Sequence, residues 1–372
     1  INLFDLGGKK LLEKKIDWNI VILKNNIKNE GTPNDKNHIK LLGLLSESGT
    51  FQMNGENNFS GNALEISNYL LLNGYIDFNG ESQLLQPEGS IIDIQSSGYI
   101  DRDQQGTKNS FNYNYWTSPV SSIGNKSNQG FDIYHVLKDG DANDRAISFN
   151  NQYHYADYNY SGNLRLSTYW MYVFHGGGNN YSEWHGIDQN THLKTGEGYT
   201  MKGTHGFANI RDIQNYTFRG MPNNGDISLN ISKGENRLLG NPYPSAIDAT
   251  EFIRDNIKDV SGGRNSKNVF NGSLYFWDHF GQQNTHILAE YVGGYAVLNL
   301  SGGIPGVSND TRINNNGQAG SKSPNRFIPV GQGFFVNATI DENSNYNFGI
   351  DGGLLTFKNN QRVYARENPG NS

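Results

Sequence analysis

The chain has 372 residues, a formal net charge of −6 and no cysteine. Without cysteine it cannot form disulfides or zinc–thiolate sites, and without a long run of lysine and arginine it offers no electrostatic footprint for a nucleic acid. No apolar run approaches the roughly 18 residues that cross a bilayer, so we expect no membrane span. The 45 glycines, 21 tyrosines and 19 phenylalanines favour short strands joined by tight turns, and we predict an all-β protein.

The start of the chain is predicted to hold a short cap before the first regular strands. Residues Lys9–Lys15 fit a short helix, and Asp17–Ile22 fits a strand. The segment Asn25–Asn37 is polar and has no periodicity, so we expect a loop there.

Residues 1–110 as a whole are predicted to form a short parallel β-solenoid with this N-terminal cap. A Gly-aromatic/apolar segment starts at Gly49 and recurs at Gly74 and Gly98, about two dozen residues apart. Apolar strands precede the copies, at Ile39–Leu45, Leu64–Leu72 and Ile91–Ile94. Such a period is typical of stacked solenoid coils. Ordinary antiparallel hairpins with chance similarity are the alternative.

Two motifs occur twice and in the same order in the rest of the chain. The first pair is Tyr115–Ser121 and Leu239–Ser245, and the second is Thr195–Met201 and Val330–Val336, which share a Gly-x-Gly-aromatic core. Aromatic segments lie between them at Ser167–Tyr172 and Ser273–Trp277. We therefore predict duplicated β-sandwich (jelly-roll-like) modules over residues 111–215 and 216–372.

Strands are expected at short intervals in both modules, and one helix is expected in the second. The helix is Ala249–Ile257, with Asp248 as its N-cap. The predicted strands are Phe131–Val136, Arg145–Phe149, Asn163–Tyr172, Glu197–Lys202, Tyr216–Gly220, Asp226–Ile231, Ser273–Trp277, Gly294–Leu300, Gln332–Val336 and Leu354–Phe357.

Several stretches between residues 70 and 365 resemble one family of bacterial proteins. The stretches are Phe111–Ser121, Phe218–Gly225, Gly240–Asp248, Gly331–Val336 and Thr356–Val363. They are similar to extracellular proteins of Bacteroidota exported by the type IX secretion system, in a region that precedes a C-terminal sorting domain. The resemblance implies a secreted or cell-surface, β-rich, adhesin-like protein with the export machinery as a partner. The chain begins at Ile1 without methionine or a signal peptide, which we interpret as a mature or trimmed terminus.

The densest set of oxygen donors is a candidate calcium site. Asp139, Asp141, Asn143 and Asp144 alternate with small residues, as a tight Ca²⁺ loop requires. The spacing is shorter than that of an EF-hand, and a solvated acidic turn is the alternative.

A Gly-rich loop with aromatic residues is a candidate glycan site. Tyr181, Trp184 and His185 could stack on sugar rings while neighbouring polar side chains supply hydrogen bonds. In the alternative interpretation Trp184 folds back onto the sandwich.

No catalytic motif is evident, so we expect a non-enzymatic module. The sequence has no His-Glu-x-x-His, Gly-x-Ser-x-Gly or phosphate-loop motif. The expected role is adhesion, glycan or protein binding at the bacterial surface, or a structural stalk. Two alternatives stay open. One is a carbohydrate-active enzyme or its binding accessory, since paired carboxylates can come from distant loops. The other is a subunit or cargo of a surface assembly tied to type IX secretion or gliding.

Overall fold

The predicted all-β class is confirmed. The structure is a computed structural model that describes residues 18–29, 38–54, 58–158, 161–177, 180–281, 284–339 and 349–367, and these are nearly all strands and the loops between them. The helix predicted over Lys9–Lys15 lies outside the described residues. None of the described helices is both long enough and apolar enough to cross a bilayer.

The predicted parallel solenoid is confirmed, with about three turns over residues 20–102. Its two walls enclose apolar side chains such as Leu44, Leu70 and Ile76. One wall pairs in the order β1-β3-β5-β7, with β8 also on β5. These strands are β1 (Ile20–Leu23), β3 (Ile39–Ser46), β5 (Ala63–Leu72), β7 (Gln83–Leu85) and β8 (Ile91–Ile92).

The loop predicted over Asn25–Asn37 is wrong in its first part, where the second solenoid wall begins, and residues 30–37 lie outside the described residues. Within that segment Ile27–Asn29 forms strand β2, which pairs in parallel with β4 (Thr50–Met53). A three-residue polar strand has no periodicity of its own, and it forms because the next coil supplies its hydrogen-bond partners.

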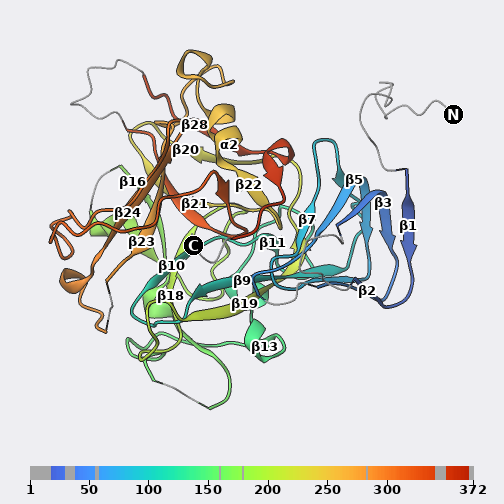
Figure 1. Cartoon of the computed structure of the whole chain (residues 1–372), viewed down its shortest axis with the longest axis horizontal. Coiled ribbons are helices and arrows are strands. Elements are labelled where there is room, and N and C mark those ends of the chain that lie inside the picture. The colour runs from blue at the N-terminus through green and yellow to red at the C-terminus, as the bar shows by residue number, and fades with distance from the viewer. Residues whose placement is uncertain are drawn as a thin grey trace.

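This wall continues without a break into the rest of the molecule. Strand β6 (Tyr75–Phe78) pairs in parallel with β9 (Tyr99–Thr107), and β9 pairs antiparallel with β19 (Ile213–Pro222). Strand β19 therefore crosses the module boundary predicted at residue 215. Figure 1 shows β9 and β19 running between the blue solenoid strands and the remaining sheets. The same sheet also holds β11 (Val120–Ser121), β12 (Leu137–Asp139) and β13 (Arg145–Ala146).

The large sheet beyond the solenoid takes strands from both halves of the chain. Its order is β10-β18-β16-β21-β27-β23-β24-β25, with β17 on β16. These strands are β10 (Tyr113–Trp116), β16 (Tyr172–Gly176), β17 (Trp184–Gly186), β18 (Tyr199–Lys202), β21 (Asn236–Gly240), β23 (Leu274–His279), β24 (Gly293–Asn299), β25 (Gly302–Ile304) and β27 (Gly333–Asn337).

The repeated sequence motifs occupy equivalent places in this sheet and contact each other crosswise. Trp116 of the first half bridges to Gln332 of the second, and Glu197 of the first half bridges to Leu239 of the second. The backbone contacts match too. The N–H of Thr117 donates to the Gly331 carbonyl at 2.9 Å, and the N–H of Gly240 donates to the Gly196 carbonyl at 3.1 Å. Both acceptor glycines have positive φ, +84° at Gly196 and +70° at Gly331, which explains the repeated glycine.

The strand predicted over Phe131–Val136 is wrong. Phe131 forms only an isolated bridge with Leu193, and Ile133–Val136 is the short helix α1. The Asp132 carboxylate accepts a hydrogen bond from the N–H of His135, which caps this turn. Apolar residues at Ile133 and Val136 suit one face of a helical turn as well as they suit a strand.

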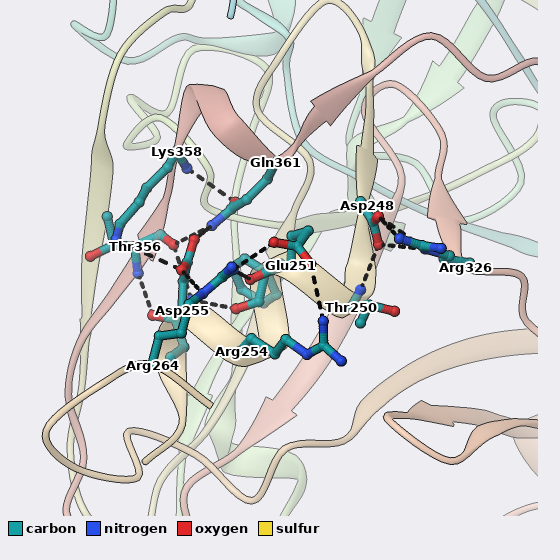
Figure 2. Close-up of polar contacts among 12 residues, drawn as sticks. Asp248, Thr250, Glu251, Arg254, Asp255, Arg264, Arg326, Thr356, Lys358 and Gln361 are labelled. Atoms are coloured by element: carbon teal, nitrogen blue, oxygen red, sulfur yellow. Dashed lines mark hydrogen bonds and ion pairs between the residues drawn. The ribbon is translucent and has the colours of Figure 1, made fainter. Parts of the chain in front are cut away.

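The helix predicted at Ala249–Ile257 is confirmed as α2 (Ala249–Asn256), with Asp248 as its N-cap. The Asp248 carboxylate accepts from the N–H of Thr250 at 3.0 Å and pairs with Arg326. Figure 2 shows Arg264 and Gln361 converging on the helix residue Asp255. Those side chains donate to the Asp255 carboxylate at 3.0 and 2.9 Å. These bonds connect α2 to the loop that carries Arg264 and to the segment that carries Gln361.

Three small sheets complete the described structure around α2 and the first module. They are β14 (Ser148–Asn150) with β15 (Arg165–Ser167), β20 (Ile227–Ile231) with β28 (Gly353–Phe357), and β26 (Phe327–Ile328), β22 (Ala246–Asp248) and β29 (Arg362–Val363). A second apolar core, including Phe252, Phe334 and Phe357, lies between α2, β27 and β28.

Candidate functional site

The predicted calcium residues form a turn that packs against β19. The Asp139 carboxylate is buried and accepts from the Asp141 N–H at 3.2 Å and from the Gln214 amide at 3.0 Å. The Asp141 carboxylate accepts from the N–H of Asn215 at 3.3 Å. Burial raises the pKa of Asp139, and the neighbouring charge of Asp141 adds to this effect.

The remaining two calcium candidates lie at the end of the same turn. Asn143 and Asp144 both adopt left-handed backbone conformations, with φ of +52° and +56°. The Asp144 carboxylate pairs with Arg219 at 3.1 Å. The carboxylates of this turn thus face different protein donors, and calcium binding here stays a prediction.

The predicted glycan residues are split between solvent and sheet. Tyr181 is 58% exposed and His185 is exposed. Trp184 instead lies on β17 and packs its ring against Phe174 and Phe335, at centroid distances of 5.0 and 5.8 Å. The structure therefore places Tyr181 and His185 at the surface while Trp184 contacts the sheet.

Beside this loop, Glu197 of the repeated glycine motif forms a buried ion-pair cluster. Its carboxylate lies 2.8 Å from His175 Nε2 and 3.2 Å from an Arg237 nitrogen, and it accepts from the Lys194 N–H. Burial pushes the pKa of Glu197 up, but His175, the Lys194 N–H and Arg237 outweigh burial and hold the pKa at about 2.

Replacing Glu197 with glutamine is expected to remove a pH-dependent part of the stability. Because the folded pKa lies below the ordinary value of 4.5, the carboxylate stabilises the fold above pH 4.5 and loses this effect as the pH falls towards 2. The full contribution of the carboxylate is about 3 kcal/mol from the size of the shift, and about 2 kcal/mol of it is lost between pH 6 and pH 3. Urea unfolding of both proteins at pH 6 and pH 3 checks it. A wild-type advantage that is the same at both values would contradict the prediction.

An open cavity of ≈ 610 Å³ lies next to the predicted calcium turn, and Asp139 lines it. Its walls come from the loop around Tyr158, the segment 162–165, the turn 204–208 and the start of β19. The lining residues are Lys108, Asp139, Tyr158, Gly162, Asn163, Leu164, Arg165, Thr204, His205, Phe207, Ala208, Arg211, Asp212, Ile213 and Gln214. Its volume is in the range of ligand sites, roughly 300–1,000 Å³.

Two aromatic side chains stand open to solvent at this cavity. Phe207 is 78% exposed and Tyr158 is 54% exposed. The turn that carries Phe207 is fixed because the Phe207 N–H donates to His205 Nδ1 at 3.1 Å and the Gly206 N–H donates to the Asp157 carbonyl at 3.1 Å. A rigid turn thus holds an apolar ring in water, where a ligand can cover it.

The polar groups of the cavity are of two kinds. Lys108, Arg165 and Arg211 contribute positive charge to the lining. The Thr204 side chain contributes a buried hydroxyl, which interacts with the buried Tyr216 hydroxyl.

Sequence reasoning missed this cavity. Its signal is the segment Gly203–Phe207, a glycine-flanked turn that ends in an aromatic residue. That turn resembles many others in a chain with 45 glycines. The spacing of the sequence therefore does not show that it lies across a cavity from the loop around Tyr158 and the segment 162–165.

The comparisons with known proteins define a family without a known function. The chain belongs to the family described as Domain of unknown function (DUF8693), which matches residues 19–370. The match spans both the solenoid and the sheets that follow it. Comparison with curated proteins gives no match. Comparison with solved structures gives none either.

Proposed function

We propose that this chain is a non-enzymatic, extracellular module exposed at the bacterial surface, where it binds a glycan. The observation that carries the proposal is the open cavity with solvent-exposed Phe207 and Tyr158 at its edge. Sugar rings present apolar C–H faces to aromatic rings and hydroxyls to polar side chains, and this cavity offers both kinds of partner. The resemblance to exported Bacteroidota proteins supports the location and the type IX export machinery as a partner.

The charges of the cavity favour an acidic glycan over a neutral one. Lys108, Arg165 and Arg211 share the lining with only two carboxylates, those of Asp139 and Asp212. The Asp139 carboxylate already accepts hydrogen bonds from Gln214 and Asp141. A carboxylated or sulfated sugar would therefore meet a net positive lining although the whole chain carries −6.

The test compares two candidate surfaces by calorimetric titration with uronic-acid and neutral oligosaccharides. Phe207→Ala is expected to weaken binding about tenfold or more, because it removes a stacking surface worth more than 1 kcal/mol. Tyr181→Ala is the matched control, since it removes an exposed aromatic ring from the loop of the earlier sequence-based candidate. Loss of binding in the Tyr181 variant alone would move the site to that loop.

A carbohydrate-active enzyme is the second candidate, and the presence of both Asp139 and Asp212 in the cavity lining favours it. Two carboxyl groups across a bound sugar are the usual machinery of glycoside hydrolysis. Release of reducing ends from any bound oligosaccharide, abolished by Asp212→Asn, would replace the non-enzymatic proposal.

A further inference from the structure

Two histidines and an aspartate from distant parts of the chain meet beside the cavity. His154 and Asp157 lie in the loop after β14, and His286 lies in the loop between β23 and β24. His154 Nδ1 is 2.6 Å from the Asp157 carboxylate, and His286 Nε2 is 3.0 Å from each of its oxygens. The possible ligand atoms of these three side chains all lie within 4.8 Å of one another, and within the described ranges no other three His, Asp or Glu residues meet this criterion.

Neighbouring groups hold each of the inner side chains in one orientation. The Ser110 hydroxyl donates to the Asp157 carboxylate at 3.0 Å. The His286 ring stacks on Trp170, with centroids 4.5 Å apart and planes inclined by 20°. Lys202 Nζ lies 2.9 Å from His286 Nδ1, so the other ring nitrogen, Nε2, is the one that faces the carboxylate. The Ser110 hydroxyl orients the carboxylate as outer contacts do in metal sites. With a metal ion on Nε2, His286 Nδ1 carries the ring proton and donates it to Lys202 as a neutral amine.

The cluster is closed on one side and open on the other. The side chains of His286 and Asp157 are 3% and 8% exposed, whereas that of His154 is 64% exposed. An ion could therefore enter from solvent past His154 and keep a position for water. Three protein ligands with one open position are the arrangement of exchangeable and catalytic zinc sites.

We propose that His154 Nδ1, the Asp157 carboxylate and His286 Nε2 bind a divalent transition-metal ion, with zinc as the best fit. Two imidazole nitrogens and one carboxylate suit zinc and its neighbours, whereas calcium and magnesium prefer all-oxygen sites. Ligand atoms around a tetrahedral zinc ion lie about 3.3 Å apart, given bonds of about 2.0–2.1 Å. The 3.0 Å contacts are close to this value, and the short 2.6 Å contact can widen because His154 is at the surface.

The site goes beyond the proposed glycan binding but lies next to that cavity. Tyr158, which stands at the edge of the cavity, follows Asp157 directly, and the Asp157 carbonyl accepts from the N–H of Gly206 in the turn that carries Phe207. A metal ion bound by Asp157 and His286 would therefore link the His286 loop to the two cavity walls that carry Tyr158 and Phe207. Metal binding is measured without any glycan, so its result does not decide whether the cavity binds a glycan.

The test is calorimetric titration of EDTA-treated, dialysed full-length chain with Zn²⁺, with Co²⁺ absorption as a second readout of the ligand set. One ion per chain is expected, and Zn²⁺ should raise the melting temperature. His154→Ala should weaken binding by more than the roughly 10- to 100-fold cost of losing an outer contact. His154 is exposed, so this variant tests the site without disturbing the core.

His135→Ala is the matched control. His135 Nδ1 also lies 2.6 Å from a carboxylate three residues earlier, Asp132, and its side chain is 57% exposed. Among the residues that the structure describes, His135 belongs to no such three-residue group. Binding retained in His135→Ala and lost in His154→Ala supports the proposal. Binding unchanged in His154→Ala, or no stoichiometric binding to the wild type, overturns it and leaves the cluster as a hydrogen-bonded structural element.

Discussion

Replacing Asn223 with leucine is expected to lower the free energy of unfolding by about 3–5 kcal/mol. The Asn223 side chain is fully buried where the two repeated proline motifs meet. Its amide donates to the Ser118 carbonyl at 3.2 Å in the first half and to the Pro242 carbonyl at 3.0 Å in the second half. Its oxygen accepts from the Ser121 hydroxyl and the Asn128 N–H.

The size of the effect follows from the groups that leucine leaves behind. Buried carbonyls and donors without partners cost about 1–3 kcal/mol each, and the proline motifs have no regular ladder to replace the lost bonds. A loss of this size is a large part of the 5–15 kcal/mol that typically stabilises a domain.

Chemical denaturation followed by circular dichroism measures this loss of stability. One further variant serves as a control for the change of side chain, and another repeats the test at a second buried asparagine. Asn190→Leu makes the same change at an exposed position and should shift stability by less than about 0.5 kcal/mol. Asn241→Leu should behave like Asn223→Leu, since the Asn241 amide donates to the carbonyls of Ser245, Ile328 and Pro329. Equal stabilities of Asn223→Leu and wild type would show that the two halves do not depend on this bridge.

The fold was predictable where a motif recurs with the same local geometry. The repeated Gly-x-Gly segments share a positive φ at Gly196 and Gly331, and each accepts the same backbone bond from the opposite half. The solenoid was predictable for the same reason, because each coil repeats its corner glycine. Strand β2 and helix α1 were not, since both are short and take their form from neighbouring chain segments.

The candidate sites were much less predictable than the fold. Sequence spacing brings Asp139, Asp141 and Asp144 together. It does not show that their carboxylates already accept hydrogen bonds from Gln214, Asn215 and Arg219, respectively. The reverse holds for His286, whose partners His154 and Asp157 lie about 130 residues earlier in the chain. These loops meet only in the assembled structure, where His286 also contacts Lys202 of β18 and the Trp170 ring.

The surroundings of Lys202 also could not be predicted from the sequence. As a charged residue at the end of the motif strand Tyr199–Lys202, it is expected at the surface. It is buried instead, with its amine 3.6 Å from the centre of the Trp170 ring, and burial lowers its pKa to about 6. The aromatic residues around it come from separate segments, and their convergence is a property of the assembled sheet.

Replacing Gly98 with alanine is expected to destabilise the solenoid by about 2–4 kcal/mol. Gly49, Gly74 and Gly98 stack at one corner of successive coils. A Cβ atom on Gly98 would lie 2.0 Å from the Gly74 carbonyl oxygen, and one on Gly74 would lie 2.8 Å from the Gly49 oxygen. Those same carbonyls accept the ladder bonds from the N–H groups of Tyr99 and Tyr75, at 3.3 and 3.0 Å. The coil therefore cannot move away from the clash without losing a ladder bond.

The control for this variant is Gly186→Ala, which makes the same change in strand β17. A Cβ atom there meets only the Tyr172 ring, at an ordinary distance of 3.8 Å, so little change in stability is expected. Urea unfolding of both variants separates a packing effect from the general effect of adding alanine to a strand. Because the solenoid wall continues through β9 into β19, the loss in Gly98→Ala should appear in the transition of the whole chain. A variant as stable as wild type would mean that successive coils are not held at the spacing that the glycine column requires.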